Sequence, residues 1–131
     1  MSILNYFLRG KSNTLIIKNN GGFTHSGPWA SLSDSVVVDR WYLGDFISVD
    51  YTISVDLDAN NKEMVKFMVT ATMNDANMVE YARSTTGTQL ITLNAQVNNS
   101  YVNIIASPAI PLAKGAKYIF STERYTGASI L

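Results

Sequence analysis

The chain has 131 residues, no cysteine, and ten acidic residues against ten basic ones. This length fits one domain with its own hydrophobic core, and the lack of cysteine excludes disulfides and thiolate metal sites. A formal net charge of zero without long charged runs argues against nucleic-acid and anionic-membrane partners, which are recognised by basic patches.

The surface is expected to be polar but weakly charged. Charged residues make up 15% of the chain, whereas about a quarter is usual. Serine, threonine and asparagine together supply 36 residues. Such a surface gives little repulsion between molecules, so the composition favours a protein that works inside an assembly.

The N-terminal residues do not have the pattern of a secretory signal. The apolar stretch there is short, is interrupted by Asn5, and follows no basic segment. Elsewhere no apolar run approaches the roughly 20 residues that a membrane-spanning helix needs. We therefore expect neither a signal peptide nor a membrane span.

The first predicted elements are short. Residues 14–18 form a strand that ends at an Asn-Asn-Gly-Gly turn. Residues 21–35 are rich in glycine, serine and proline, which predicts an exposed loop carrying His25 and Trp29. A further short strand is expected at 36–39.

A long hairpin is the clearest prediction. Residues 47–57 and 64–73 each alternate apolar and polar side chains, the period of a strand with one buried face. The linking residues, 58–63, include Asn60 and Asn61, which tolerate left-handed turn positions.

Four more strands are predicted at 78–83, 89–94, 101–106 and 117–124, with Gly87 turning the chain between the first two. About seven or eight strands result, and no stretch has a helical period. The expected fold is all-β: a single antiparallel β-sandwich, jelly-roll-like or immunoglobulin-like, over one domain of residues 1–131. Residues 1–12 and 126–131 are candidate arms.

Hydrolytic chemistry finds little support. His25 is the only histidine, so it would have to be the base of any hydrolytic triad. No G-x-S-x-G motif accompanies it. A small hydrolase is therefore the least favoured hypothesis.

The carboxylates give no recognisable site. Asp50, Asp56, Glu80 and Glu123 are candidates for glycosidase chemistry, but Asp50 and Asp56 lie about 20 Å apart on one strand, too far to act as a pair. Asp56 and its neighbours resemble the start of a calcium loop. The sixth and twelfth positions hold Asn61 and Phe67 instead of glycine and glutamate, so turn chemistry is favoured.

Aromatic and methionine residues are the remaining functional signal. Exposed tryptophan and tyrosine can anchor interfaces or stack on sugars, and methionine adapts to irregular contacts. The interface candidates are Trp29, Trp41, Tyr42, Met64 and Met68. A core position is the alternative for Trp41, and a buried second sheet face is the alternative for the two methionines.

Four stretches resemble small β-rich structural proteins from the virions of tailed bacteriophages, most of all those of marine phages, including cyanophages. They are RWYLGDFISVDYTI, EYARSTTGTQLITLNAQV, VNIIASPA and GAKYIFSTERY. The similarity covers residues 41–125, and the N-terminal LRGKSN also fits. These stretches contain strands and turns and no catalytic motif, so the resemblance transfers no catalytic residue.

The resemblance implies a non-enzymatic virion component, either a capsid decoration protein or a tail- or fibre-associated subunit. Such a protein would act by self-assembly, with a trimer favoured, and by docking on capsid, tail or fibre proteins. It implies no cofactor, metal, nucleic acid or membrane. The alternative is a carbohydrate-binding or adhesion β-sandwich module, in which His25 and Trp29 would contact a host-surface glycan.

Overall fold

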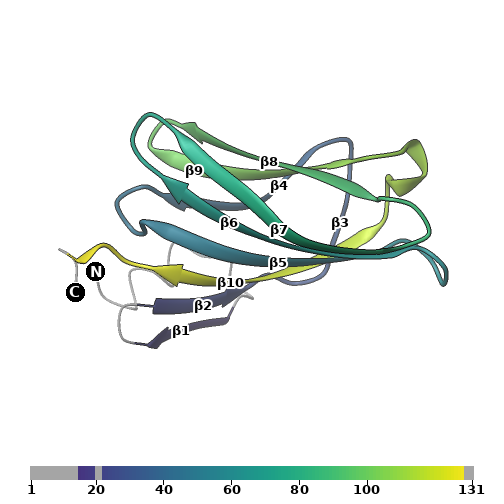
Figure 1. Ribbon diagram of the computed structural model, residues 1–131, viewed down its shortest axis with the longest axis horizontal. Helices are drawn as coiled ribbons and strands as arrows, with labels where there is room; N and C mark the ends of the chain where they lie inside the picture. The colour runs from purple at the N-terminus through teal and green to yellow at the C-terminus, as the bar shows by residue number, and fades with distance from the viewer. Residues whose placement is uncertain (1–14, 20–21, 129–131) are drawn as a thin grey trace.

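The computed structural model describes residues 15–19 and 22–128, and it shows two antiparallel sheets packed face to face (Figure 1). The strands are β1 (Leu15–Asn19), β2 (Gly22–Ser26), β3 (Ala30–Ser31), β4 (Val36–Tyr42), β5 (Ser48–Asp56), β6 (Lys62–Ala71), β7 (Ala76–Thr86), β8 (Ile91–Asn98), β9 (Tyr101–Pro108) and β10 (Lys117–Tyr125). A short 3-10 turn, η1 (Pro111–Ala113), precedes β10. The prediction of an all-β antiparallel sandwich is confirmed.

The larger sheet has the strand order β1-β2-β10-β5-β6-β7, with β3 paired to β10 beyond the end of β2. The smaller sheet has the order β4-β9-β8. We name them by their continuous strand orders, which leave out the two-residue β3, as the six-stranded and the three-stranded sheet. The chain crosses between them after β3, β4, β7 and β9, so β7 and β8 lie in different sheets although they follow each other in sequence.

The long hairpin of β5 and β6 forms the middle of the six-stranded sheet, as predicted. Val49, Ile53 and Val65 point inward and are fully buried. Tyr51 and Phe67 face each other across the hairpin, with their rings stacked at 4.6 Å between centroids. The hydrophobic core lies between this face and the inner residues of β4, β8 and β9.

The prediction of a loop over residues 21–35 is wrong in part, because this stretch contains β2 and β3. Both strands pair with β10, on the side of β10 that does not contact β5. Gly27 separates them, and a Cβ there would lie 2.5 Å from the ring of Phe120. The described residues therefore form ten strands, where seven or eight were expected.

Two turns differ in detail from the sequence prediction. Among the described non-glycine residues, positive φ occurs at Asn99 and Ser100, and not at Asn60 or Asn61. In the β5–β6 turn the Asp58 carboxylate instead accepts hydrogen bonds from the backbone amides of Asn60 and Asn61, at 2.8 and 2.9 Å. Gly87 has a φ of 78°, in agreement with its predicted turn role.

The candidate N-terminal arm, residues 1–12, lies outside the described residues, as do residues 129–131 of the candidate C-terminal tail. No helix within the described residues is long and apolar enough to cross a membrane.

The β8–β9 turn yields a stability prediction. Asn99 and Ser100, with φ of 51° and 67°, make the two-residue turn that favours Asn-Gly. Replacing Ser100→Gly removes the steric cost of the left-handed conformation, so we expect the free energy of unfolding to rise by about 1 kcal/mol. Urea denaturation measures this change. The control Thr92→Gly, at an exposed extended position in β8, should lower stability. Equal effects of the two variants would contradict the turn assignment.

Candidate functional site

A buried ion pair joins the two sheets. Arg124 Nη2 on β10 donates to Asp39 Oδ2 on β4 at 2.7 Å, and both side chains are almost fully buried. Tyr51 on β5 donates its hydroxyl to the same oxygen at 2.6 Å. Asp39 reaches this inner position because β4 has a bulge between Val37 and Asp39 that turns two successive side chains toward the core.

Further hydrogen bonds complete this cluster. The indole Nε1 of Trp41 donates to the Tyr51 hydroxyl at 3.0 Å, and Arg124 Nε donates to Thr122 Oγ1 at 3.0 Å. Burial, and next the Asp39 carboxylate, raise the pKa of Tyr51 well above its usual value. The Tyr51 hydroxyl therefore stays protonated and keeps its hydrogen bond to Asp39, so the cluster links the two sheets.

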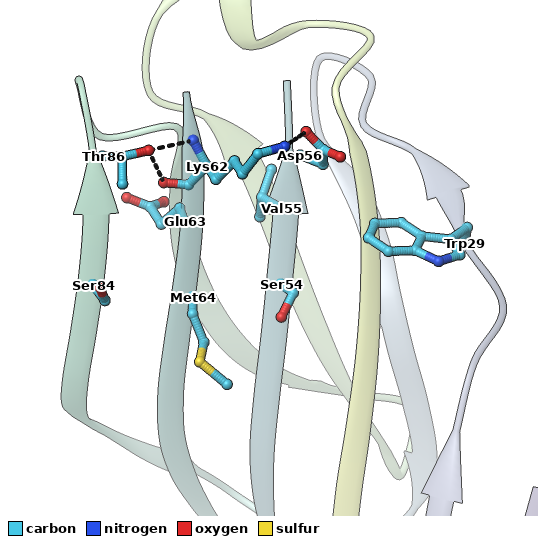
Figure 2. Close-up of a pocket in the computed structure, with 9 residues that line it drawn as sticks. All are labelled: Trp29, Ser54, Val55, Asp56, Lys62, Glu63, Met64, Ser84 and Thr86. Carbon is cyan, nitrogen blue, oxygen red and sulfur yellow. Dashed lines mark hydrogen bonds and ion pairs between the residues drawn. The ribbon is translucent and has the colours of Figure 1, made fainter. Parts of the chain in front are cut away.

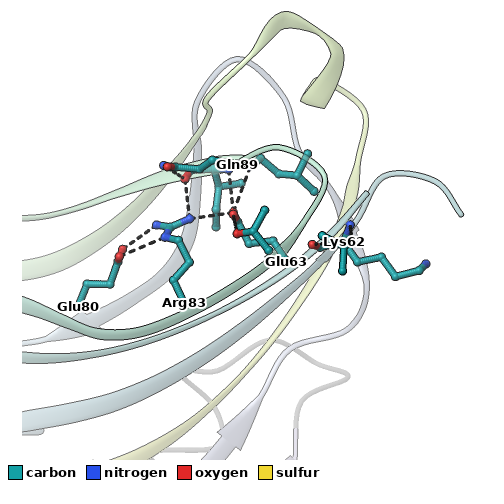
Figure 3. A network of polar contacts seen from close by, with 9 residues as sticks. Lys62, Glu63, Glu80, Arg83 and Gln89 are labelled. Carbon is teal, nitrogen blue, oxygen red and sulfur yellow. Dashed lines mark hydrogen bonds and ion pairs between the residues drawn. The ribbon is translucent and has the colours of Figure 1, made fainter. Parts of the chain in front are cut away.

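A second polar cluster fastens the crossover from β7 to β8 (Figure 3). Glu63 Oε1 accepts from Arg83 Nη1 at 2.8 Å and from the backbone amides of Leu90 and Ile91. Arg83 also binds Glu80 at 2.6 Å, and this hydrogen bond lowers the pKa of the Glu80 carboxyl. Glu80, a glycosidase candidate in the sequence, is thus held by an arginine in a structural contact.

The structure overturns the predicted environment of His25. This residue lies in β2, is only 5% exposed and packs with its ring centroid 5.9 Å from that of Phe120. The reason is that β2 pairs with β10, so Phe23 and His25 alternate inward. His25 is not in an exposed loop and cannot contact a glycan from this position.

The predicted interface residues do not gather on one surface. Trp41 is 3% exposed and belongs to the core cluster, which corrects its interface assignment. Tyr42 is exposed on the three-stranded sheet, whereas Met64 and Met68 are exposed on the outer face of the six-stranded sheet. Trp29, 54% exposed, lies between β2 and β3 beside β10.

One hollow of about 310 Å³ lies on the outer face of the six-stranded sheet (Figure 2). Ser54 and Ser84 flank Met64 on neighbouring strands, and Trp29 stands at the far rim beyond β10. An ion pair between Lys62 Nζ and Asp56 Oδ1, at 2.8 Å, closes one end. We call this the Trp29 hollow.

A second hollow of about 330 Å³ lies on the same face and is lined by Asp50, Thr70, Asn77, Val79 and Tyr125, among others. We call it the Asp50 hollow. Tyr81 donates its hydroxyl to Asp50 Oδ1 at 2.7 Å. The β5–β10 register places Asp50 directly opposite Glu123, a pairing that sequence analysis missed because only the strand register reveals it.

The outer face of the three-stranded sheet carries a small aromatic cluster. Tyr42 and Tyr101 are cross-strand partners with ring centroids 5.6 Å apart in an edge-to-face arrangement. The Arg40 guanidinium lies 4.0 Å from the centroid of the Tyr101 ring. Within β4, β8 and β9, all of which the structure describes, Arg40 is the only exposed charged residue.

Within the described residues, no group of three or more His, Cys, Asp or Glu side chains is arranged to hold a metal ion. Asp58, part of the calcium-loop-like stretch, accepts hydrogen bonds from its own turn, and the backbone amide of Asn60 lowers the pKa of its carboxyl.

These elements define an antiparallel β-sandwich whose larger sheet carries the Trp29 hollow and the Asp50 hollow. No protein-family model matches the sequence, and no curated protein matches it either. Among solved structures, the tailspike protein of Acinetobacter baumannii phage AM24 is similar, with a TM-score of 0.50 and 7% sequence identity over 82% of this chain and 27% of that chain.

A second similar structure is the tailspike protein gp49 of Acinetobacter baumannii bacteriophage Fri1, described as a capsular polysaccharide depolymerase. Its TM-score is 0.48, with 10% identity over 95% of this chain and 21% of that chain. The chain therefore spans about a quarter of the length of these tailspikes. The likeness to the AM24 protein shows a shared fold with part of that tailspike.

The buried ion pair yields a second prediction. Replacing Asp39→Ala leaves the Arg124 guanidinium buried without its carboxylate, so the free energy of unfolding should fall by about 3–5 kcal/mol. The matched control is Asp34→Ala, which removes an exposed ion pair with Lys114 and should cost less than about 1 kcal/mol. Urea denaturation of both variants measures the difference, and similar losses would contradict the role of Asp39.

Proposed function

We propose that this chain is a β-sandwich module of a phage tail-associated virion protein that works by assembly rather than by catalysis. The observation that carries the proposal is the fold shared with part of the AM24 tailspike. The sequence resemblance to small β-rich virion proteins points in the same direction. A tailspike fold favours a tail or fibre position over capsid decoration.

The proposed lack of catalysis has two supports. The only histidine is buried against Phe120, where it cannot act as a base on a substrate at the surface. Asp50 and Glu123 project side by side from the same sheet face, and each accepts a hydroxyl hydrogen bond, from Tyr81 and Thr24. Glycosidase carboxylates flank the scissile bond from two sides of a cleft.

The proposed contact between copies is the outer face of the three-stranded sheet. Tyrosine and arginine are enriched among the residues that dominate interface energies, and Arg40, Tyr42 and Tyr101 are clustered here. Apart from Arg40, the exposed strand residues of this face are uncharged. A second copy can therefore approach with little electrostatic repulsion. The outer face of the six-stranded sheet also exposes Met64 and Met68, but Met64 lines the Trp29 hollow and Met68 lines the Asp50 hollow.

The assembly proposal predicts a discrete oligomer, with a trimer favoured, in light scattering of the purified chain. Because Tyr42 is exposed and its ring lies at the proposed contact, Tyr42→Asp should shift the protein to monomer without changing its circular dichroism. The control Met68→Asp places the same charge on the opposite sheet face and should leave the oligomer intact. A monomeric parent protein would overturn the proposal, and dissociation by Met68→Asp alone would move the contact to the six-stranded sheet.

Carbohydrate adhesion is the second candidate function, and the Trp29 hollow is the observation that favours it. An indole that is 54% exposed stands at its rim. The hydroxyls of Ser54, Ser84 and Thr86 line the same hollow. Exposed indoles stack on the apolar faces of sugars, while hydroxyls exchange hydrogen bonds with their edges.

The adhesion candidate is tested on an array of bacterial surface oligosaccharides. Any oligosaccharide that binds the parent protein should bind Trp29→Ala less tightly, because this substitution removes the stacking surface. The expected loss is at least tenfold, about 1.4 kcal/mol, whereas Trp29→Phe keeps most of the affinity. A reducing-end assay on the same samples should show no cleavage. Equal affinity of Trp29→Ala and the parent protein would rule out this hollow as the site.

A further inference from the structure

The Asp50 hollow arises from the order of side chains across four strands. Cross-strand pairing puts Tyr125, Ser48, Thr70 and Asn77 in one row, from β10 to β7. The middle residues Ser48 and Thr70 are small, whereas the Tyr125 ring at one end of the row is large, so the surface is lower beside that ring. The resulting volume of about 330 Å³ lies at the lower end of the range for small-molecule sites.

The lining combines apolar surface with hydrogen-bonding groups. Met68, Val79 and Tyr125 are each nearly half exposed at this position. Asn77 offers both donors and acceptors, and Thr70 offers a hydroxyl. A pyranose ring matches both properties, because its C–H faces are apolar and its edge carries hydroxyls that form hydrogen bonds.

Asp50 is held in place for recognition. The Tyr81 hydroxyl donates to Oδ1 at 2.7 Å, and this hydrogen bond raises the pKa of Tyr81, which therefore stays a neutral donor. A carboxylate has about four acceptor positions, so Asp50 keeps capacity for hydroxyl donors from a ligand. Hydrogen bonds to an ionised acceptor are about twice as strong as neutral ones.

The charges around the hollow select the kind of ligand. Glu123 stands directly across from Asp50, and like charges in such a pair repel. None of the nine lining residues is lysine, arginine or histidine. An acidic sugar would meet the charge of Asp50 with no cationic residue in the lining, whereas a neutral sugar would supply hydroxyl donors to the carboxylate.

We propose that the Asp50 hollow binds one neutral saccharide unit, with Tyr125 and Val79 against the ring and Asp50 and Asn77 on its hydroxyls. This site differs from the Trp29 hollow, because Ser48 and Ser54 are six positions apart on β5, about 20 Å at 3.3 Å per residue. The inference does not depend on the tail-associated role or on the oligomeric state.

The test is an amide NMR titration of the full chain with single monosaccharides: glucose, galactose, mannose, rhamnose, N-acetylglucosamine, N-acetylgalactosamine and the acidic glucuronate. At least one neutral sugar should give saturable shifts at Ser48, Thr70 and Asn77, with a dissociation constant on the order of 1–10 mM. Glucuronate should bind at least tenfold more weakly than that neutral sugar.

Variants separate recognition from folding. Tyr125→Ala and Asn77→Ala should each weaken binding at least tenfold, while the control Trp29→Ala should leave these shifts unchanged. Asp50→Asn should raise the affinity for glucuronate relative to the neutral sugar, an effect that a merely structural role would not produce. All four variants are checked by thermal melting, and they substitute exposed or half-buried side chains.

Three results would overturn the proposal. The first is the absence of saturable shifts with every neutral sugar. The second is glucuronate binding as tight as that of the neutral sugar. The third is a shift of the same amides with protein concentration in the absence of sugar, which would show that a second copy occupies the hollow.

Discussion

The Arg124–Asp39 ion pair is the constraint on which the alignment of the two sheets depends. Apolar contacts between the sheets are strong in sum but have little directional preference. A buried charge pair tolerates one geometry, because moving either partner leaves an unpaired charge in the core. Tyr51 and Trp41 add donors to the same cluster. The bulge in β4 and the last residues of β10 are thereby fixed relative to each other.

This alignment also determines what the outer surface presents. Side chains alternate along each strand, so fixing the inner residues of β5 and β10 fixes their outer neighbours as well. Asp50 and Glu123 face each other outward because Val49, Tyr51 and Arg124 face inward. The Asp50 hollow lies over the small outer residues Ser48 and Thr70, and the Trp29 hollow lies over Ser54 and Ser84 on either side of Met64. The surface that could bind a ligand is therefore a product of the core.

Sequence reasoning succeeded where one strand carries its own signal. The hairpin of β5 and β6 was predicted within about two residues, because each strand alternates strictly. The strands β2 and β3 were missed because they contain or flank glycine and proline, and their pairing with distant β10 has no local pattern. The burial of His25 follows from that missed pairing. Likewise, the juxtaposition of Asp50 and Glu123 depends on a register between distant segments, which residue types alone do not specify.

The β7 edge of the six-stranded sheet is shaped in a way that limits further strand pairing. β7 is the last strand in the order of this sheet. Its pairing with β6 has a bulge, because Ala82 pairs with Lys66 and Glu80 pairs with Phe67, which leaves Tyr81 as the extra residue. A bulge at this position bends the strand, and Glu80 and Arg83 add charge along it. Both features hinder the addition of another strand. Continuous strand pairing across the β7 edge is thus discouraged, so this edge is a poor template for fibril growth.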